Sequence, residues 1–139
     1  MISATTPYIF FDGTCAEALE FYESVLGAKT EMKMTYGESP AAVHVPPGAH
    51  GRIIHARLRI GDSVVLASDD TSDHPAGKAG RFALTIHTAK AAEAERIFRD
   101  LSAGGEVTMA MNKTFFAERF GSVHDKFGIP WMVICDKES

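Results

Sequence analysis

Residues 7–27 read PYIFFDGTCAEALEFYESVLG and place a strand signal directly before a helix signal. Residues 7–11 are an aromatic and β-branched run that predicts a strand, and Asp12-Gly13 predicts a turn at its end. Thr14-Cys15-Ala16-Glu17 has the pattern of a capping box, in which the threonine hydroxyl accepts a hydrogen bond from the backbone of the glutamate. Gly27 is the left-handed residue that commonly ends a helix. The segment therefore predicts one β-α unit.

Three further strand signals follow this unit. In residues 30–36 the side chains Met32, Met34 and Tyr36 alternate with polar ones, which predicts a strand with one apolar face. Residues 37–51 are rich in proline and glycine and predict a long loop without regular structure, of the kind that often serves as a lid or binding loop. Residues 54–60 and 63–68 alternate around a Gly-Asp turn, so they predict a β-hairpin.

The same order of signals returns in the second half of the chain. Residues 69–80, rich in Asp, Ser, Gly and Pro, predict a linker. After it we expect a strand, a helix and three strands, at residues 82–86, 88–102, 107–111, 115–125 and 131–135. An internal repeat constrains architecture more than single elements do. We therefore expect a single α+β domain of residues 1–139, built from two tandem βαβββ modules at about residues 1–70 and 80–139.

Composition excludes several classes of protein. The chain has 14 Lys and Arg residues against 18 Asp and Glu, so its net charge is −4. This charge does not indicate the basic surface that binding to nucleic acid requires. The longest apolar run, residues 131–135, is too short to span a bilayer, and the N-terminus has no signal-peptide pattern. The only cysteines, Cys15 and Cys135, have no metal-like spacing and are expected to be reduced thiols. We expect a cytoplasmic protein without nucleic-acid or membrane partners.

Short motifs along nearly the whole chain resemble a known family. They are PYIFFDG at residues 7–13, ALEFY at 18–22, LGA at 26–28, HARLRIGD at 55–62, KTFF at 113–116, RFG at 119–121, DKFG at 125–128 and WM at 131–132. In this order they resemble the PhnB-like group, sometimes given a methyltransferase-like domain name, of the vicinal oxygen chelate superfamily. That superfamily includes glyoxalase I, bleomycin-resistance proteins, extradiol dioxygenases and fosfomycin-resistance enzymes. The resemblance implies sheets that curl into an open cup with the helices outside, a ligand cavity on the concave face, and a homodimer.

Metal-dependent members of the superfamily carry ligands at four positions. The resemblance places these at about Thr6, Val65, Arg81 and Met132, and none is a ligand of the kind that hard divalent cations prefer. We therefore expect no metal and no cofactor at this site. The alternative is a displaced site in which His55, or histidines of the long loop such as His44 and His50, supply ligands, although solvated histidines are common in such loops.

Strand alternation and the family register predict the lining of the cup. The mainly aromatic and apolar set suits an organic ligand with an apolar body and an anionic group held by its one cation, Arg81. Arg81 covering the sheet edge in solvent is an equal alternative. The residues predicted to face the cup are Tyr8, Phe10, Val65, Arg81, Ala83 and Met132.

Other side chains are candidates for chemistry. His55 shares a strand face with Arg57 and Arg59 and is the candidate acid or base, because imidazole titrates near neutrality; a surface or interface histidine is the alternative. A second ligand wall is predicted at Lys113, Phe115 and Phe116 together with Arg119 and Phe120. The alternative is that the rings are buried in the core or a dimer interface while Lys113 and Arg119 stay in solvent. Cys15 at a helix start is either a dipole-activated thiol or a small buried residue.

Together these features predict a metal-independent protein that binds a small apolar or aromatic organic ligand, with catalysis left open. One alternative is a metal-dependent lyase, isomerase or dioxygenase with displaced ligands. Another is a non-catalytic interaction module whose phenylalanine-rich surfaces serve assembly. The sequence contains no nucleophilic triad pattern, phosphate loop or dinucleotide fingerprint, so hydrolase, kinase and nicotinamide-dependent activities have no motif behind them.

Overall fold

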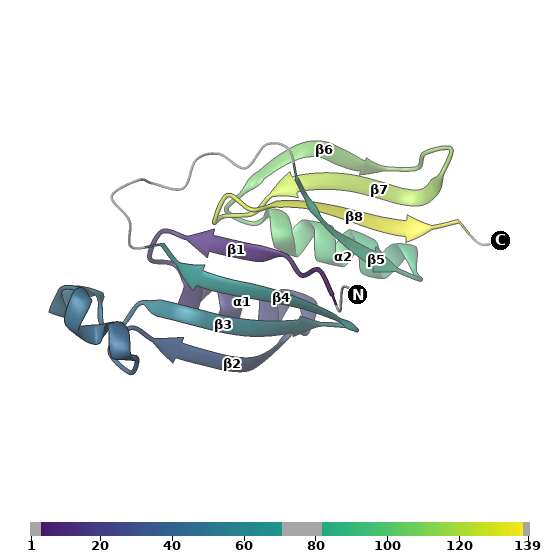
Figure 1. Cartoon of the computed structure of the whole chain (residues 1–139). Coiled ribbons are helices and arrows are strands. Elements are labelled where there is room, and N and C mark those ends of the chain that lie inside the picture. Colours follow the sequence, from purple (N-terminus) through teal and green to yellow (C-terminus); the bar gives the residue numbers. More distant parts are fainter. Residues whose placement is uncertain (1–3, 71–81, 138–139) are drawn as a thin grey trace. The chain divides into compact units, whose positions relative to one another are not determined.

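The computed structural model describes residues 4–70 and 82–137. They form two compact units, one made of residues before 71 and the other of residues after 81 in the sequence (Figure 1). Each unit contains one α-helix and one four-stranded mixed sheet, in the order strand, helix and three strands. The predicted α+β class and the tandem βαβββ modules are confirmed.

The first unit is a sheet with a helix on one face. Its elements are β1 (Tyr8–Phe11), α1 (Cys15–Leu26), β2 (Lys29–Thr35), β3 (Ile53–Ile60) and β4 (Ser63–Asp69). The strand order is β1-β4-β3-β2, with β1 parallel to β4 and the other pairs antiparallel. Helix α1 packs on β2, β3 and β4. The core beneath it contains two buried pairs across β3 and β4, Ala56 with Ala67 and Leu58 with Val65.

Helix α1 begins in a different way from the prediction. Gly27 ends it with φ of 65° in the left-handed region, as expected. The predicted capping box is wrong, because the Thr14 side chain makes no capping hydrogen bond. The N–H of Cys15 instead donates to Oδ1 of Asp69 at 2.9 Å. A carboxylate distant in sequence therefore caps this helix.

The connection between β2 and β3 is more ordered than predicted. It contains two short 3₁₀ helices, η1 (Pro40–His44) and η2 (Pro47–Ala49). The N–H of Gly37 donates to the His50 carbonyl at 2.9 Å, which extends the contact between the two strands beyond the sheet. Residues 37–51 therefore form a compact extension of the hairpin.

The predicted linker begins too early. Asp69 is the last residue of β4 and only 2% exposed, and its buried carboxylate accepts backbone hydrogen bonds from Cys15 and Ile53. Residues 71–80 of the predicted linker lie outside the described part of the chain.

The second unit repeats this architecture. Its elements are β5 (Leu84–Thr88), α2 (Ala91–Ser102), β6 (Glu106–Asn112), β7 (Ala117–His124) and β8 (Pro130–Asp136). The strand order is β5-β8-β7-β6, and α2 contacts all four strands. Trp131 is buried on the α2 face, which confirms the prediction that it belongs to the core. Its indole N–H donates to Oδ2 of Asp125 at 2.9 Å.

A close approach of helix and sheet explains one glycine of this unit. A Cβ atom on Gly121 of β7 would lie 2.6 Å from Cε2 of Phe98 on α2. The missing side chain therefore lets the helix pack directly on the sheet. Along the described parts of the chain, neither helix is long and apolar enough to cross a membrane.

Candidate functional site

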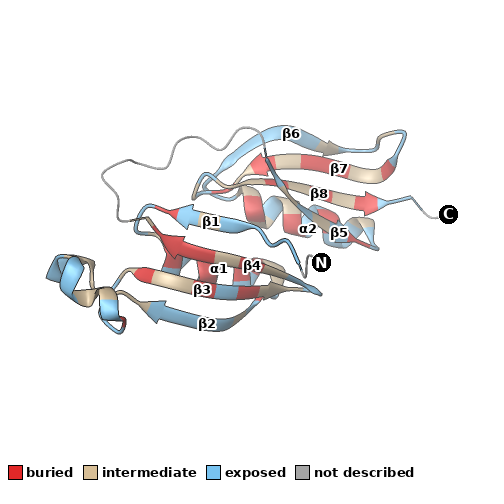
Figure 2. Cartoon of the chain, in the orientation of Figure 1, coloured by how far each residue is buried: buried red, intermediate tan, exposed pale blue. Residues whose placement is uncertain are grey.

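The face of the first sheet that lies opposite α1 carries a group of exposed functional side chains. The pairing register aligns Tyr8 with Leu66, Leu66 with Arg57, and Arg57 with Met32. Directly paired residues share a face of a sheet, so this row crosses all four strands on the side away from the helix. We call it the open face, and its functional residues are Tyr8, Phe10, Met32, Met34, His55, Arg57 and Arg59. Figure 2 shows that the outer strands β1 and β2 are largely exposed.

An aromatic cluster covers one side of the open face. The phenol oxygen of Tyr8 lies 3.0 Å from Nδ1 of His55. The rings of Tyr8 and Phe10 stack with their centroids 4.8 Å apart. Because β4 separates β1 from β3, the Tyr8 side chain must reach across β4 to contact His55. The cluster remains open to solvent, since Tyr8 is 39% and Phe10 is 55% exposed.

A charged cluster lies on the other side of the open face. Glu31 on β2 accepts from Nε of Arg57 and from Nε of Arg59, both at 2.9 Å. The hydrogen bonds from Arg59 and then Arg57 lower the pKa of the Glu31 carboxyl below its ordinary value. One ionised carboxylate therefore holds two guanidinium groups in a fixed orientation.

Glu31 was missed by sequence reasoning because of a bulge. Simple alternation along β2 places Glu31 opposite to Met32 and Met34. The β2–β3 register shifts between Thr30 and Met32, and the Glu31 side chain bonds to arginines of the open face. A bulge changes the phase of alternation without a sequence signal of its own here. In the sequence, the only signal of an acidic partner was the pair of positive charges at Arg57 and Arg59 on one strand face.

The predicted orientation of Val65 is wrong. Val65 is 6% exposed and pairs with the buried Leu58 on the face that α1 covers. A shift of one residue moves a side chain to the other face of a sheet, so Leu66 occupies the open face instead. In the second unit, Met132 pairs with Thr85 and Ser122 and alternates with the buried Trp131, which places it on the face away from α2. Arg81 lies outside the described residues.

The residues at the expected metal positions do not fit a hard divalent cation. Neither Val65 nor its neighbour Leu66 has a donor atom, and Met132 offers only a thioether. Thr6 contributes a single exposed hydroxyl. No group of three or more His, Cys, Asp or Glu side chains that could hold a metal ion occurs within residues 4–70 and 82–137.

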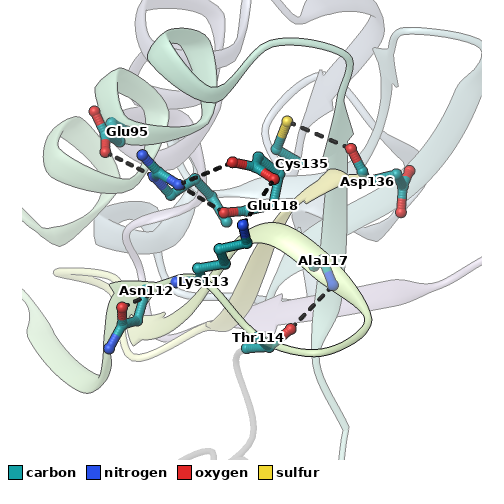
Figure 3. Close-up of polar contacts among 9 residues, drawn as sticks. Glu95, Asn112, Lys113, Thr114, Ala117, Glu118, Cys135 and Asp136 are labelled. Carbon is teal, nitrogen blue, oxygen red and sulfur yellow. Dashed lines mark hydrogen bonds and ion pairs between the residues drawn. The ribbon is translucent and has the colours of Figure 1, made fainter. Parts of the chain in front are cut away.

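The second predicted ligand wall is the tip of the β6–β7 hairpin. Thr114 closes the turn, because its N–H donates to the Ala117 carbonyl at 3.0 Å and its hydroxyl accepts from Ala117 N–H at 3.0 Å. The turn presents Phe115, which is 89% exposed, and the ring of Phe116 packs edge-on against it. In Figure 3 the Lys113 ammonium points toward Glu118, with which it forms a 4.0 Å ion pair.

Arg119 is not part of this wall. Its Nε lies 3.1 Å from Oε1 of Glu95, which is on α2. The β7–β8 register pairs Arg119 with the buried Cys135. Arg119 therefore ties the sheet to its helix, and the hairpin tip retains Lys113, Phe115 and Phe116.

Cys15 is a buried structural residue. It is fully buried, and burial, together with the negative charge of Asp69, raises the pKa of its thiol to about 12. The alternative of a dipole-activated thiol is wrong, because burial and the charge of Asp69 both disfavour the thiolate and raise the pKa rather than lower it.

Comparison with known proteins gives the family of this chain, the group with a methyltransferase-like domain name that the sequence motifs predicted. The family model described as 3-demethylubiquinone-9 3-methyltransferase matches residues 3–134, so the chain belongs to this family. Protein YjdN of Escherichia coli (strain K12) is 38% identical over 138 residues, with 92% of each chain covered.

Solved structures show the same architecture. Protein PA1353 from Pseudomonas aeruginosa matches with a TM-score of 0.87 and 35% identity, over 99% of this chain and 100% of that one. A putative 3-demethylubiquinone-9 3-methyltransferase, PhnB protein, from Bacillus cereus matches with a TM-score of 0.82 and 23% identity, over 96% and 99% of the chains. The fosfomycin resistance protein FosX from Listeria monocytogenes matches with a TM-score of 0.70 and 9% identity, over 99% and 96%. The last two similarities concern the fold alone.

Proposed function

We propose that the open face of the first unit binds a small organic molecule with an aromatic or apolar body, without a metal ion. The observation that carries this proposal is the stacked Tyr8–Phe10 pair, which stays exposed although α1 covers the other face of the same sheet. Full burial of an exposed apolar side chain contributes about 1.5–3 kcal/mol, and a ligand that covers these half-buried rings gains part of that free energy. A solvent-exposed aromatic pair with a polar neighbour at hydrogen-bond distance is typical of a binding surface.

Each residue of the site has a separate role in this proposal. Phe10 and Tyr8 supply the stacking surface, and Met34, which pairs with His55 across β2 and β3, supplies an adaptable apolar contact. His55 and the Tyr8 hydroxyl supply the polar contacts that orient the ligand. Arg81 and Met132 stay predictions as further ligand contacts.

We also propose that this site can carry out an acid–base reaction, which the hydrogen bond between Tyr8 and His55 favours. When Nδ1 accepts from the phenol, the neutral imidazole carries its proton on Nε2. The pair then presents one donor and one acceptor to a bound molecule, as proton transfer requires. The geometry does not favour methyl transfer, the activity in the family's description, over other reactions.

Thermal shift and NMR titration with a panel of small aromatic compounds test the binding proposal. We expect bound compounds to raise the melting temperature, because a ligand specific for the native state stabilises it. Phe10→Ala should weaken binding about tenfold or more, which corresponds to about 1.4 kcal/mol. Val43→Ala is the matched control, since Val43 is an exposed apolar residue on η1, outside the open face. Equal binding by wild type and Phe10→Ala would contradict the proposal.

A second candidate function, assembly, is favoured by the exposed hairpin tip. Phe115 and Phe116 are adjacent, exposed and held on a closed turn. We propose that they contact a second copy of the chain in a homodimer. Analytical ultracentrifugation of Phe115→Ser/Phe116→Ser should show a larger monomer fraction than wild type, and an unchanged sedimentation profile would exclude this role.

A further inference from the structure

We propose that Arg57 and Arg59 form an anion site on the open face, so that its ligand is an elongated aromatic acid with a carboxylate at one end. This inference rests on the proposed function, since it assigns the ligand class of the same site. The aromatic cluster receives the ring, and the two arginines receive the carboxylate.

The two guanidinium groups are oriented in advance. Glu31 bonds the Nε of each arginine, and Nη2 of Arg59 lies 3.4 Å from the same carboxylate. Within the described residues neither arginine makes another ion pair or hydrogen bond, so most of their N–H donors remain available. Arginine forks match the planar geometry of a carboxylate. Fixing them beforehand lowers the entropy cost of binding.

The local charge favours an anion. Two arginines and one glutamate leave a net positive charge in the cluster. Lys29 adds to it, since Lys29 pairs with Arg59 across β2 and β3 and so lies on the same face. The exposed fractions of the Arg57 and Arg59 side chains are 45% and 41%, so a ligand can reach both.

The distance between the two clusters sets the length of the ligand. Tyr8 and Arg57 belong to one row across the sheet, with Leu66 between them. Two strand spacings separate their Cα atoms by about 10 Å. His55 lies two residues before Arg57 on β3, so both side chains are on the same face. His55 therefore lies beside a ligand whose ring contacts Tyr8 and whose carboxylate contacts Arg57. A ring joined to a carboxylate by a short chain spans this distance better than benzoate does.

Isothermal titration with matched probes tests this assignment. The probes are 3-phenylpropionate and its neutral amide, 3-phenylpropionamide, with benzoate as the shorter acid. We expect wild type to bind 3-phenylpropionate at least about tenfold more tightly than the amide, and more tightly than benzoate, with an affinity for the acid that falls as NaCl rises.

Variants separate the two clusters. Arg57→Gln and Arg59→Gln should each reduce the preference for the acid while leaving affinity for the amide unchanged. Arg96→Gln is the matched control, because Arg96 is an exposed, ion-paired arginine on α2 of the second unit, and it should keep the preference. Phe10→Ala should weaken acid and amide equally. If Arg57→Gln does not fold, Arg57→Lys keeps the charge without the fork and should lower acid affinity alone.

The outcomes distinguish the inference from the proposed function. Equal binding of acid and amide, both weakened by Phe10→Ala, would overturn the anion site and leave the aromatic site standing. A preference for the acid that survives both Arg57→Gln and Arg59→Gln would also overturn it. Acid binding that depends on the arginines but not on Phe10 would support the anion site and contradict the aromatic one. Absence of binding by all three probes at millimolar concentration would overturn the assigned ligand class.

Discussion

Oδ1 of Asp69 accepts a hydrogen bond from the backbone N–H of Cys15 at 2.9 Å and so joins the end of β4 to the first turn of α1. The other carboxylate oxygen, Oδ2, accepts from the N–H of Ile53 at 2.8 Å, at the start of β3. The carboxylate therefore satisfies two backbone donors that α1 and β3 leave buried. Together with the hydrogen bond from the Asp70 N–H to the Phe11 carbonyl at 2.6 Å, this contact holds both ends of the loop between β1 and α1 against the end of β4.

Asp69→Asn should lower the stability of the protein. An amide group offers one acceptor oxygen in place of two, so one of the two N–H groups would lose its partner at a cost of about 1–3 kcal/mol. Urea unfolding followed by circular dichroism measures the change. Asp62→Asn in the exposed β3–β4 turn is the control and should leave the midpoint unchanged. Equal midpoints for the two variants would contradict the role of Asp69.

The Cys15 thiol should resist modification in the folded protein. Its pKa of about 12, raised by burial and by Asp69, keeps it protonated at pH 8, and it is inaccessible as well. In a Cys135→Ser background, we expect reaction with a thiol reagent such as Ellman's reagent to require unfolding by urea. Rapid labelling in buffer would show that α1 opens at its first turn.

The same thiol makes the fold sensitive to alkali. An unfolded chain ionises Cys15 near the ordinary value of 9.0, whereas the folded chain holds the proton up to about pH 12. The unfolded state therefore releases this proton first, and the stabilisation present below pH 9 is lost as the pH rises toward 12. We expect the stability difference between wild type and Cys15→Ala to shrink above pH 9. A difference that stays constant from pH 8 to 11 would contradict this.

Glu31 should act in the opposite pH range. Hydrogen bonds from Arg59 and Arg57 hold its pKa below the ordinary 4.5, so its ionised form favours the folded state. This contribution is present above pH 4.5 and is lost as the pH falls through the lowered pKa. The stability difference between wild type and Glu31→Gln should therefore decline in acid, as measured by chemical unfolding at a series of pH values. Glu20→Gln, at an exposed position on α1, should show no such decline.

Gly105, between α2 and β6, should tolerate no side chain. A Cβ there would overlap the carbonyl oxygen of His124 and lie 2.8 Å from the carbonyl carbon of Asp125, both backbone atoms. We expect Gly105→Ala to cost more than about 1 kcal/mol, since backbone must move to relieve the clash. Gly48→Ala is the control, because a Cβ at Gly48 meets no atom within 4 Å, and it should change stability by less than about 0.5 kcal/mol. Thermal unfolding compares the two.

Local pattern was sufficient for the order of the elements. The apolar residues of α1 recur at helical spacing, and Ala18, Leu19, Tyr22 and Val25 are buried as that spacing requires. Gly27 ends the helix because few other residues adopt a positive φ readily. The repeated order of strand, helix and three strands follows from such signals, which depend on neighbours within a few residues of each other.

The candidate site depended on contacts that no local pattern encodes. The family register placed Tyr8 and Phe10 on the cup-facing side, and alternation placed His55, Arg57 and Arg59 on one strand face. Neither indicated the hydrogen bond from Tyr8 to His55 across an intervening strand. The family register assigned the wrong face to Val65, and an error of one residue in register reverses every side chain of a strand.

The sequence alone was enough to establish the α+β class, the two βαβββ modules and the family, because periodicity, turn residues and short motifs are properties of contiguous segments. Only the tertiary structure determined that Asp69, and not Thr14, caps α1. It also determined that Glu31 accepts hydrogen bonds from Arg57 and Arg59. Both depend on which strands pair and in what register. That choice is made by the packing of the whole unit, which selects among partners tens of residues apart.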